Sequence, residues 1–190
     1  MKERDGVVVV PDFLSADTLA LFTEEISMLP RCDIEGHLYD KCIHLGSSAV
    51  LSPLLPVVRD SVQEFIEHYY SCSVGQEVMG SLVSVGPGWD LQLHSDSDDD
   101  VSNNIETYAG YPSRDISTVL YFNNHGYDFT GGDLFMPNQD LIILPKAGSL
   151  VAFPSGEKYM HQVSKVQSGE RLLVSTFWHV LERFDSTRYV

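Results

Sequence analysis

A mainly β fold, with helices packed outside a β-sandwich or jelly roll, is the fold class that the sequence predicts. Segments with helical periodicity are confined to about the first 75 residues, whereas residues from Glu77 onward form short apolar runs separated by turn-forming residues. No repeat or linker interrupts the 190 residues. The chain is therefore expected to form one domain, 1–190, with a helical part at about 1–75 and a β core at about 76–180.

The N-terminal part is expected to begin with a strand and to continue with two helices. The β-branched run at 6–10 favours a strand, and Ser15 is a candidate N-cap for a helix that ends near Met28. A second helix is expected at 54–70, whereas residues 30–50 show no clear period and are expected to be irregular. The apolar stripes assigned to buried faces are Leu19, Phe22, Ile26 and Leu29 on the first helix, and Val57, Val58, Val62, Phe65 and Ile66 on the second.

Short strands account for most of the second half of the chain. In the strand expected at 116–122, alternation places on one face, taken as the inner face, Ser117, Val119, Tyr121 and Asn123. The predicted strands lie at 82–85, 89–93, 116–122, 133–136, 140–144, 149–153, 161–166 and 171–179.

Composition and charge disfavour several classes of function. A formal net charge of −15 disfavours nucleic acid as a partner, because phosphates are bound through an excess of Lys and Arg. No segment approaches the roughly 20 apolar residues of a membrane span, and the N-terminal apolar run is too short for a signal peptide, so a cytoplasmic protein is expected. Three cysteines without Cys-x-x-Cys spacing, Cys32, Cys42 and Cys72, favour free thiols in a reducing compartment.

The segment His94-Ser95-Asp96 places two metal-binding side chains close together in the sequence. In an extended strand, residues i and i+2 point to the same face, so His94 and Asp96 can bind one ion together. With one more histidine from elsewhere, a histidine and a carboxylate form the facial triad of non-haem Fe(II) proteins, which leaves coordination positions open. The segment therefore indicates a candidate metal centre.

The pattern around this segment extends through the second half of the chain. His161 follows His94 after 67 residues, and Arg171 follows ten residues later. In these residues and spacings the sequence resembles the 2-oxoglutarate and Fe(II)-dependent dioxygenases, specifically their prolyl-4-hydroxylase-like branch. The resemblance covers most of the chain, because further family-like stretches occur in the same order at 7–15, 117–123, 131–135 and 145–153.

The resemblance implies a double-stranded β-helix (jelly-roll) core buttressed by N-terminal helices. It also implies Fe(II) bound by His94, Asp96 and His161, with 2-oxoglutarate and O2 as cosubstrates and ascorbate as a candidate reductant. The C5 carboxylate of 2-oxoglutarate is expected to bind Tyr121 and Arg171, whose planar fork of donors suits a carboxylate. No catalytic residue beyond the metal ligands is expected.

The activity that the resemblance implies is hydroxylation of an unactivated C–H bond, coupled to conversion of 2-oxoglutarate into succinate and CO2. The expected substrate is a prolyl residue of a peptide or protein, and a free amino acid or small metabolite is the alternative. Neither nucleic acid nor a membrane is expected as a partner, and the oligomeric state is left open. Candidates for contact with substrate, or for the surroundings of the metal ligands, are Asn123, Trp89 and Phe177.

Two positions depart from the family pattern. Val85 occupies the place of a family tyrosine that contacts 2-oxoglutarate, so Tyr121 is expected to carry more of that contact. Phe177 stands where tryptophan is common, and strand parity predicts that Phe177 faces the core while Trp178 points to the other side. Related enzymes that halogenate their substrates have Gly or Ala at the position of Asp96, which leaves a coordination site for halide. The carboxylate of Asp96 therefore disfavours halogenation as the activity.

Two other classes of protein are kept as alternatives. A cupin-like metal protein that does not use 2-oxoglutarate would typically contain a His-x-His pair with a glutamate, which this chain lacks. A catalytically inactive scaffold would be expected to have lost one of the residues His94, Asp96, His161 and Arg171, all of which this chain keeps. The polar and acidic segment 97–111 is expected to be mobile and to form part of a lid.

Overall fold

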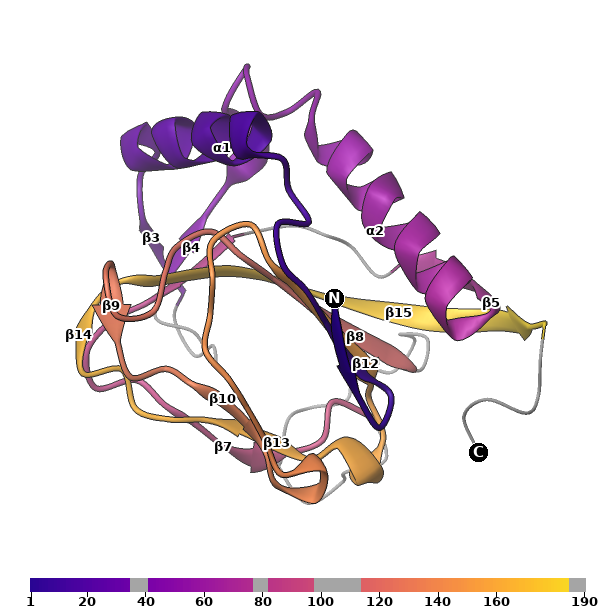
Figure 1. Cartoon of the computed structure of the whole chain (residues 1–190). Helices are drawn as coiled ribbons and strands as arrows, with labels where there is room; N and C mark the ends of the chain where they lie inside the picture. The colour runs from indigo at the N-terminus through magenta and orange to yellow at the C-terminus, as the bar shows by residue number, and fades with distance from the viewer. Residues whose placement is uncertain (35–40, 77–81, 98–113, 185–190) are drawn as a thin grey trace.

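The computed structural model describes residues 1–34, 41–76, 82–97 and 114–184, and most of their strands form two facing antiparallel sheets. Figure 1 shows the larger sheet in the middle of the molecule, with two helices over one face and the smaller sheet over the other. This arrangement is the predicted sandwich with helices packed outside it.

The larger sheet has nine strands, in the order β1-β2-β12-β8-β15-β6-β4-β3 with β5 also paired to β15. Its centre is the long strand β15, which pairs with β8, β6 and β5. The members of this sheet are β1 (Lys2–Arg4), β2 (Val7–Val10), β3 (Cys32–Asp33), β4 (Lys41–Ile43), β5 (Cys72–Gln76), β6 (Leu82–Val85), β8 (Ile116–Tyr121), β12 (Leu150–Pro154) and β15 (Arg171–Arg183).

The smaller sheet has the order β11-β10-β13-β7, and β14 pairs with β9 in a separate two-stranded ladder. These strands are β7 (Leu91–His94), β9 (Phe129–Thr130), β10 (Leu134–Met136), β11 (Leu141–Ile143), β13 (His161–Val163) and β14 (Ser168–Gly169). Short 3₁₀ helices join some of the elements: η1 (Leu45–Ser47), η3 (Pro137–Gln139) and η4 (Glu157–Tyr159).

Helix α1 (Ala16–Met28) begins where the sequence predicts. Ser15 is its N-cap, and the Ser15 Oγ accepts a hydrogen bond of 3.1 Å from a backbone N–H in the first turn. Phe22 and Ile26 bury the face that packs on the larger sheet, where the Phe22 and Phe122 rings lie 5.4 Å apart. The helix is therefore held both by its cap and by its apolar stripe.

Helix α2 (Leu55–Tyr70) also matches its predicted range closely. The prediction that Val57 faces inward is wrong, because its side chain is 60% exposed. Neighbouring residues of a helix point about 100° apart, so burying Val58 turns Val57 toward solvent. Its buried residues are Val58, Val62, Ile66 and Tyr70. Neither of the described helices is long and apolar enough to cross a membrane.

The prediction that residues 30–50 are irregular is wrong. β3 and β4 pair with each other, and β4 also pairs with β6, so this region forms one edge of the larger sheet. With β1, β2 and β5, the N-terminal part contributes five strands to that sheet. β3 and β4 are two and three residues long, too short to show a period in the sequence.

The larger sheet is buried on both faces. Along β8, Ile116 and Leu120 belong to the core shared with the helices, whereas Tyr121 belongs to the core between the two sheets. Ser117 lies on the same face as Tyr121 and is 1% exposed. The predicted alternation is therefore confirmed from Ser117 to Tyr121, and the inner face that it defines is the face toward the smaller sheet.

The aromatic pair on β15 corrects one prediction. Trp178 is completely buried in the core beneath the helices, and its Nε1 donates a hydrogen bond of 2.9 Å to Thr118 Oγ1. Phe177 is partly exposed on the other face, opposite Ser117. The two residues point to opposite sides as predicted, but the prediction that Phe177 faces the core instead of Trp178 is wrong, because the helices turn the second face of the sheet into a core as well.

Replacing these two aromatic residues should have unequal effects on stability. Trp178→Ala should lower the free energy of unfolding by about 3–5 kcal/mol, because it removes a fully buried ring and leaves Thr118 without its donor. Phe177→Ala should cost less, because its ring is already partly exposed. Urea unfolding followed by circular dichroism measures both values, with Trp178→Phe as a milder variant if the alanine variant does not fold. Equal losses for the two alanine variants would contradict this packing.

Candidate metal centre

Two strands of the smaller sheet bring His94, Asp96 and His161 together. His94 ends β7 and His161 begins β13, and these two residues are direct partners across the antiparallel pair. Asp96 follows two residues after β7 ends, and its backbone N–H donates a hydrogen bond of 3.1 Å to the carbonyl of Ser155. Residues 67 positions apart in the sequence are thus placed side by side by strand pairing.

The three side chains converge closely enough to share one ion. His94 Nε2 lies 3.4 Å from Asp96 Oδ1, and His161 Nε2 lies 3.6 Å from Asp96 Oδ2. One ligand atom from each residue can be chosen so that all lie within 4.8 Å of one another. Two imidazole nitrogens and a carboxylate oxygen form the donor set of a non-haem Fe(II) site, so this cluster fits such an ion.

Backbone carbonyl groups orient both imidazole rings. His94 Nδ1 lies 2.8 Å from the carbonyl oxygen of Gln92, and His161 Nδ1 lies 3.0 Å from that of Tyr159. Since a carbonyl oxygen can only accept, each Nδ1 carries the proton and each Nε2 keeps a lone pair in the neutral ring. Metal-binding histidines are commonly fixed in this way, with the other ring nitrogen donating to a carbonyl.

The charges at the cluster also suit a cation. Burial disfavours the Asp96 carboxylate, but His161, His94 and a hydrogen bond from Ser117 outweigh burial and lower the pKa of Asp96. Burial lowers the pKa of His161 and keeps its ring neutral. For His94, burial is outweighed by Asp96, which raises its pKa. A cation at this site would therefore compete with protonation of His94, because the Asp96 carboxylate favours both.

Arg171 supplies a buried positive charge at the start of β15. Its side chain is 2% exposed, and its Nη2 donates a hydrogen bond of 3.3 Å to the Tyr121 hydroxyl. Within the described ranges, its Nε has no hydrogen-bond partner and no carboxylate lies within ion-pair distance of it. A buried guanidinium with free donors is strongly disfavoured unless an anion reaches it, so this side chain fits a carboxylate ligand.

The absence of a side chain at Gly132 leaves space for the side chain of Arg171. The Gly132 backbone has a φ of +70°, and a Cβ there would lie 2.8 Å from Arg171 Cδ. Both the conformation and the close approach favour glycine at this position. A larger residue at position 132 would collide with the Arg171 side chain.

A partly exposed ion pair holds Glu170, the residue before Arg171. Arg31 Nε and Nη2 donate to the two carboxylate oxygens of Glu170 at 3.1 and 3.0 Å, and Ser84 Oγ donates to the same carboxylate. The hydrogen bonds from Arg31 lower the pKa of Glu170, although burial opposes them. Arg31 Nη1 also donates to the carbonyls of Ile26 and Leu29 at the end of α1. This network fastens the start of β15 to α1.

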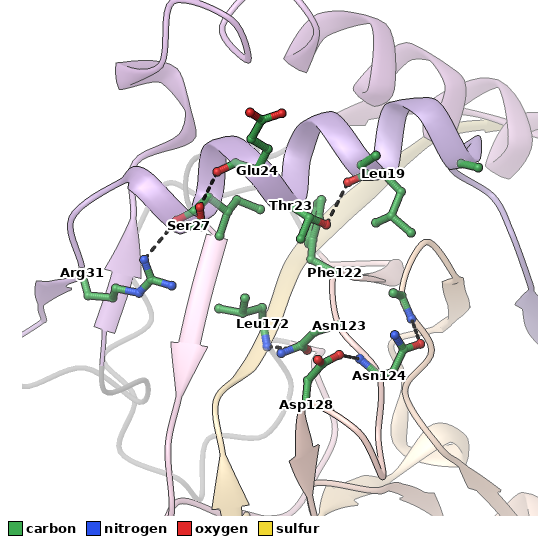
Figure 2. A pocket seen from close by; sticks show the side chains of 14 residues that line it. Leu19, Thr23, Glu24, Ser27, Arg31, Phe122, Asn123, Asn124, Asp128 and Leu172 are labelled. Carbon is green, nitrogen blue, oxygen red and sulfur yellow. Dashed lines mark hydrogen bonds between the residues drawn. The ribbon is translucent and has the colours of Figure 1, made fainter.

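Asn123 lies in a groove beside this network instead of at the metal centre. Its amide donates to the carbonyl of Glu170, and its Oδ1 accepts a hydrogen bond of 3.0 Å from Leu172 N–H. Asn123 thus holds both neighbours of Arg171 by their backbone. Figure 2 shows it with Leu172 and Arg31 in the groove, about 740 Å³ in volume, between α1 and the larger sheet. The predicted alternation does not reach Asn123, because β8 ends at Tyr121.

The remaining candidates lie around the site. Trp89 is half-buried before β7 and packs against the core between the sheets, and its carbonyl accepts a hydrogen bond of 2.9 Å from Val166 N–H. Phe177 lies on the face of Ser117, with the Arg114 guanidinium 4.1 Å from its ring centre. The segment 97–111 predicted to form a lid lies, beyond residue 97, outside the described residues.

Several residues at the site were not singled out from the sequence. Ser117 supports Asp96, and its Oγ also lies 2.7 Å from Ser155 Oγ. The strand alternation already placed Ser117 on the inner face, so this signal was available. Arg31 and Glu170 lie 139 residues apart, and no local pattern could have paired them.

The family model described as "2OG-Fe(II) oxygenase superfamily" matches residues 80–179, more than half of the chain. The chain belongs to this superfamily. Membership implies an enzyme that uses Fe(II), 2-oxoglutarate and O2, which the donor set at the metal centre fits. The resemblance drawn from the sequence motifs is thereby confirmed.

Two curated relatives match part of the oxygenase chain. Prolyl 3-hydroxylase 3 of Mus musculus is 35% identical over 95 residues, which cover 46% of this chain and 12% of that protein. The human "2-oxoglutarate and iron-dependent oxygenase domain-containing protein 3" is 33% identical over 67 residues, or 34% of this chain and 21% of that protein. The chain thus spans only a small part of the length of these relatives.

Solved structures share the fold of this oxygenase. A prolyl-4-hydroxylase of Pseudomonas putida has a TM-score of 0.63 at 20% identity, covering 95% of this chain and 94% of that one. The viral collagen prolyl hydroxylase of Paramecium Bursaria Chlorella virus-1, as its 2OG complex, has a TM-score of 0.59 at 16% identity, covering 95% and 97%. The predicted jelly-roll core is therefore confirmed.

The Arg31–Glu170 pair should make stability depend on pH. A lowered folded-state pKa stabilises the fold above the ordinary glutamate pKa, and that contribution is lost as the pH falls through the folded value. Glu170→Gln should therefore lower the free energy of unfolding at neutral pH, and its difference from the parent should shrink in acid. Asp60→Asn, which breaks an exposed pair with Arg59, is the control and should change little. A pH-independent difference for Glu170→Gln would contradict this role.

Proposed function

We propose that this oxygenase hydroxylates a prolyl residue of a peptide or protein. In this proposal His94, Asp96 and His161 hold Fe(II), and Arg171 with Tyr121 binds the C5 carboxylate of 2-oxoglutarate. The observation that carries it is the pairing of a His-Asp-His cluster with a buried arginine that has unused donors, in a chain of this superfamily. No other side chain is assigned a catalytic role.

Hydrogen bonds and charges orient the three side chains for metal binding. The carbonyl groups of Gln92 and Tyr159 keep both Nε2 atoms free to bind, and the low pKa of Asp96 keeps its carboxylate charged. Fe(II) with 2-oxoglutarate and O2 supplies the oxidising chemistry, in which one O atom enters the substrate and the other enters succinate as CO2 is released. The protein contributes binding, orientation and exclusion of water.

Arg171 and Tyr121 suit the distal carboxylate of 2-oxoglutarate. The guanidinium offers a planar fork of donors for a carboxylate. Burial raises the pKa of Tyr121 despite the opposing effect of Arg171, so its phenol stays protonated and can donate. Val85, which is Arg171's partner across the β15–β6 pair, has no polar group to offer. Tyr121 is therefore the neutral donor of the proposed site.

Part of the site is shielded from water. His161 and Tyr121 are 5% and 0% exposed, and the Phe153 ring lies 4.9 Å from the His161 ring. In so apolar a setting the attraction between Arg171 and a carboxylate is stronger than in water. Phe177, on the same face of the sheet and partly exposed, is the apolar surface that we assign to substrate.

A prolyl substrate is supported by one of the curated relatives, which is named prolyl 3-hydroxylase 3. We further propose that residues 1–190 act as one catalytic domain. Strands β1–β5 lie in the same sheet as strands of the region 80–179 that the family model matches. A cytoplasmic location, a free-amino-acid substrate and a role for ascorbate stay predictions from the sequence.

Succinate formation tests the proposed substrate class. The parent protein, loaded with Fe(II), should turn 2-oxoglutarate into succinate faster with proline-containing peptides than with the same peptides carrying alanine, and the peptide should gain one oxygen atom by mass spectrometry. Asp96→Ala, which removes the carboxylate from the cluster, is the inactive control. Turnover with free amino acids but not with peptides would replace the prolyl proposal, and no turnover with either would refute it.

Binding of 2-oxoglutarate should depend on Arg171. Arg171→Ala should spare metal binding but weaken 2-oxoglutarate about 10- to 100-fold, because a charge-assisted hydrogen bond contributes roughly 1.5–3 kcal/mol. Arg171→Lys should recover part of the loss, since a charge remains without the fork. Tyr121→Phe should cost about 1 kcal/mol.

Calorimetric titration of 2-oxoglutarate into the Mn(II)-loaded variants measures these affinities. Lys165→Ala is a matched control, because it removes an exposed cation near the start of β15. If Arg171→Ala bound 2-oxoglutarate as tightly as the parent, another residue would have to be the anchor.

A further inference from the structure

We propose that Cys32 and Cys42 form a reversible thiol–disulfide site at the edge of the larger sheet. β3 and β4 pair antiparallel, and in their register Cys32 lies directly opposite Cys42. Both thiols are free in the structure. Because no Cys-x-x-Cys spacing joins them, the strand pairing alone reveals this site.

Direct partners in an antiparallel pair have the geometry that a disulfide requires. Their Cα atoms lie about 4.5–5.5 Å apart, depending on the hydrogen-bonding position, and their side chains point to the same face. A disulfide bridges Cα atoms about 4.4–6.8 Å apart. The bond between Cys32 and Cys42 can therefore close without moving either strand out of register.

The two thiols differ in exposure and therefore in their role in the proposed oxidation. Cys32 is partly exposed, so a peroxide from solvent can reach it, whereas Cys42 is 7% exposed. The Cys42 Sγ lies 3.7 Å from His44 Nε2. Peroxides oxidise accessible thiols to sulfenic acids, which then condense with a neighbouring thiol.

The oxidation needs one peroxide and two steps. The sulfur of Cys32 attacks hydrogen peroxide, the O–O bond breaks, and a sulfenic acid and water form. The sulfur of Cys42 then attacks the sulfenic sulfur, the S–O bond breaks, and the second water leaves as the S–S bond forms. Two thiols have lost two electrons to the peroxide. A dithiol reductant restores both thiols by thiol–disulfide exchange and is itself oxidised to a disulfide.

The site lies on the face of the sheet that carries the proposed 2-oxoglutarate residues. Cys42 is the cross-strand partner of Val83, Val83 of Leu173, and Leu173 of Tyr121. Cross-strand partners point to the same face, so the dithiol and Tyr121 belong to one row of side chains. The proposal does not depend on the reaction that the enzyme catalyses, because it follows from the register of β3 and β4.

Peptide mapping after peroxide treatment tests the site. Trypsin cleaves after Arg31, Lys41, Arg59 and Arg114, which puts each of the three cysteines in a separate peptide. The 190-residue protein, free of metal, is treated with hydrogen peroxide, blocked with a thiol-alkylating reagent and digested without reductant. The expected product is peptide 32–41 linked to peptide 42–59, and it should disappear after treatment with dithiothreitol.

Thiol counts on variants provide the controls. The treated parent should lose two of its three thiols and keep that of Cys72, which is 0% exposed. Cys72→Ala should still form the linked peptides, whereas Cys32→Ser and Cys42→Ser should not. A bond to Cys72, a bond between two molecules, or retention of all three thiols under peroxide that oxidises a free dithiol would overturn the proposal.

Discussion

The antiparallel pairing of β13 with β7 is the constraint on which the candidate site depends. It sets His161 opposite His94, and a hydrogen bond to the Ser155 carbonyl turns Asp96 toward both rings. Neither histidine could be held so close to the other by local structure. Carbonyl groups next to each histidine in the chain then fix which ring nitrogen is free. Strand register therefore determines the donor set, and short-range hydrogen bonds determine its protonation.

A second constraint acts at the other end of the site, where Arg171 is buried with unused donors. A buried charge destabilises the fold unless an oppositely charged ligand pairs with it. The surrounding structure must therefore hold the Arg171 side chain in this position. The Arg31–Glu170 pair and Asn123 hold the residues on either side, and Gly132 leaves room for the side chain. The helix α1 thus contributes to the site from the far face of the sheet, through the backbone of β15.

The sequence was sufficient to predict the parts of the molecule that have strong local signals. The Ser15 cap and the range of α2 follow from capping and periodicity, whereas the family resemblance supplied the set of His94, Asp96 and His161 and the pairing of Arg171 with Tyr121. The strands β3 and β4 are too short to show a period, and β5 pairs with the distant strand β15. The Arg31–Glu170 pair could not be predicted because its residues lie far apart in the sequence, and the Cys32–Cys42 register could not be predicted because strands of two and three residues show no period. Trp178 was misjudged because alternation gives the face of a residue but not what covers that face.

The central claim is that one ion and one molecule of 2-oxoglutarate occupy the space between the His-Asp-His cluster and Arg171. A crystal structure of the protein with Mn(II) and 2-oxoglutarate, grown without O2, tests it most directly. The ion should lie about 2.0–2.3 Å from one atom each of His94, Asp96 and His161. The C5 carboxylate should lie within hydrogen-bond distance of Arg171 and the Tyr121 hydroxyl. An ion bound elsewhere, or a 2-oxoglutarate that leaves Arg171 without a partner, would contradict the assignment.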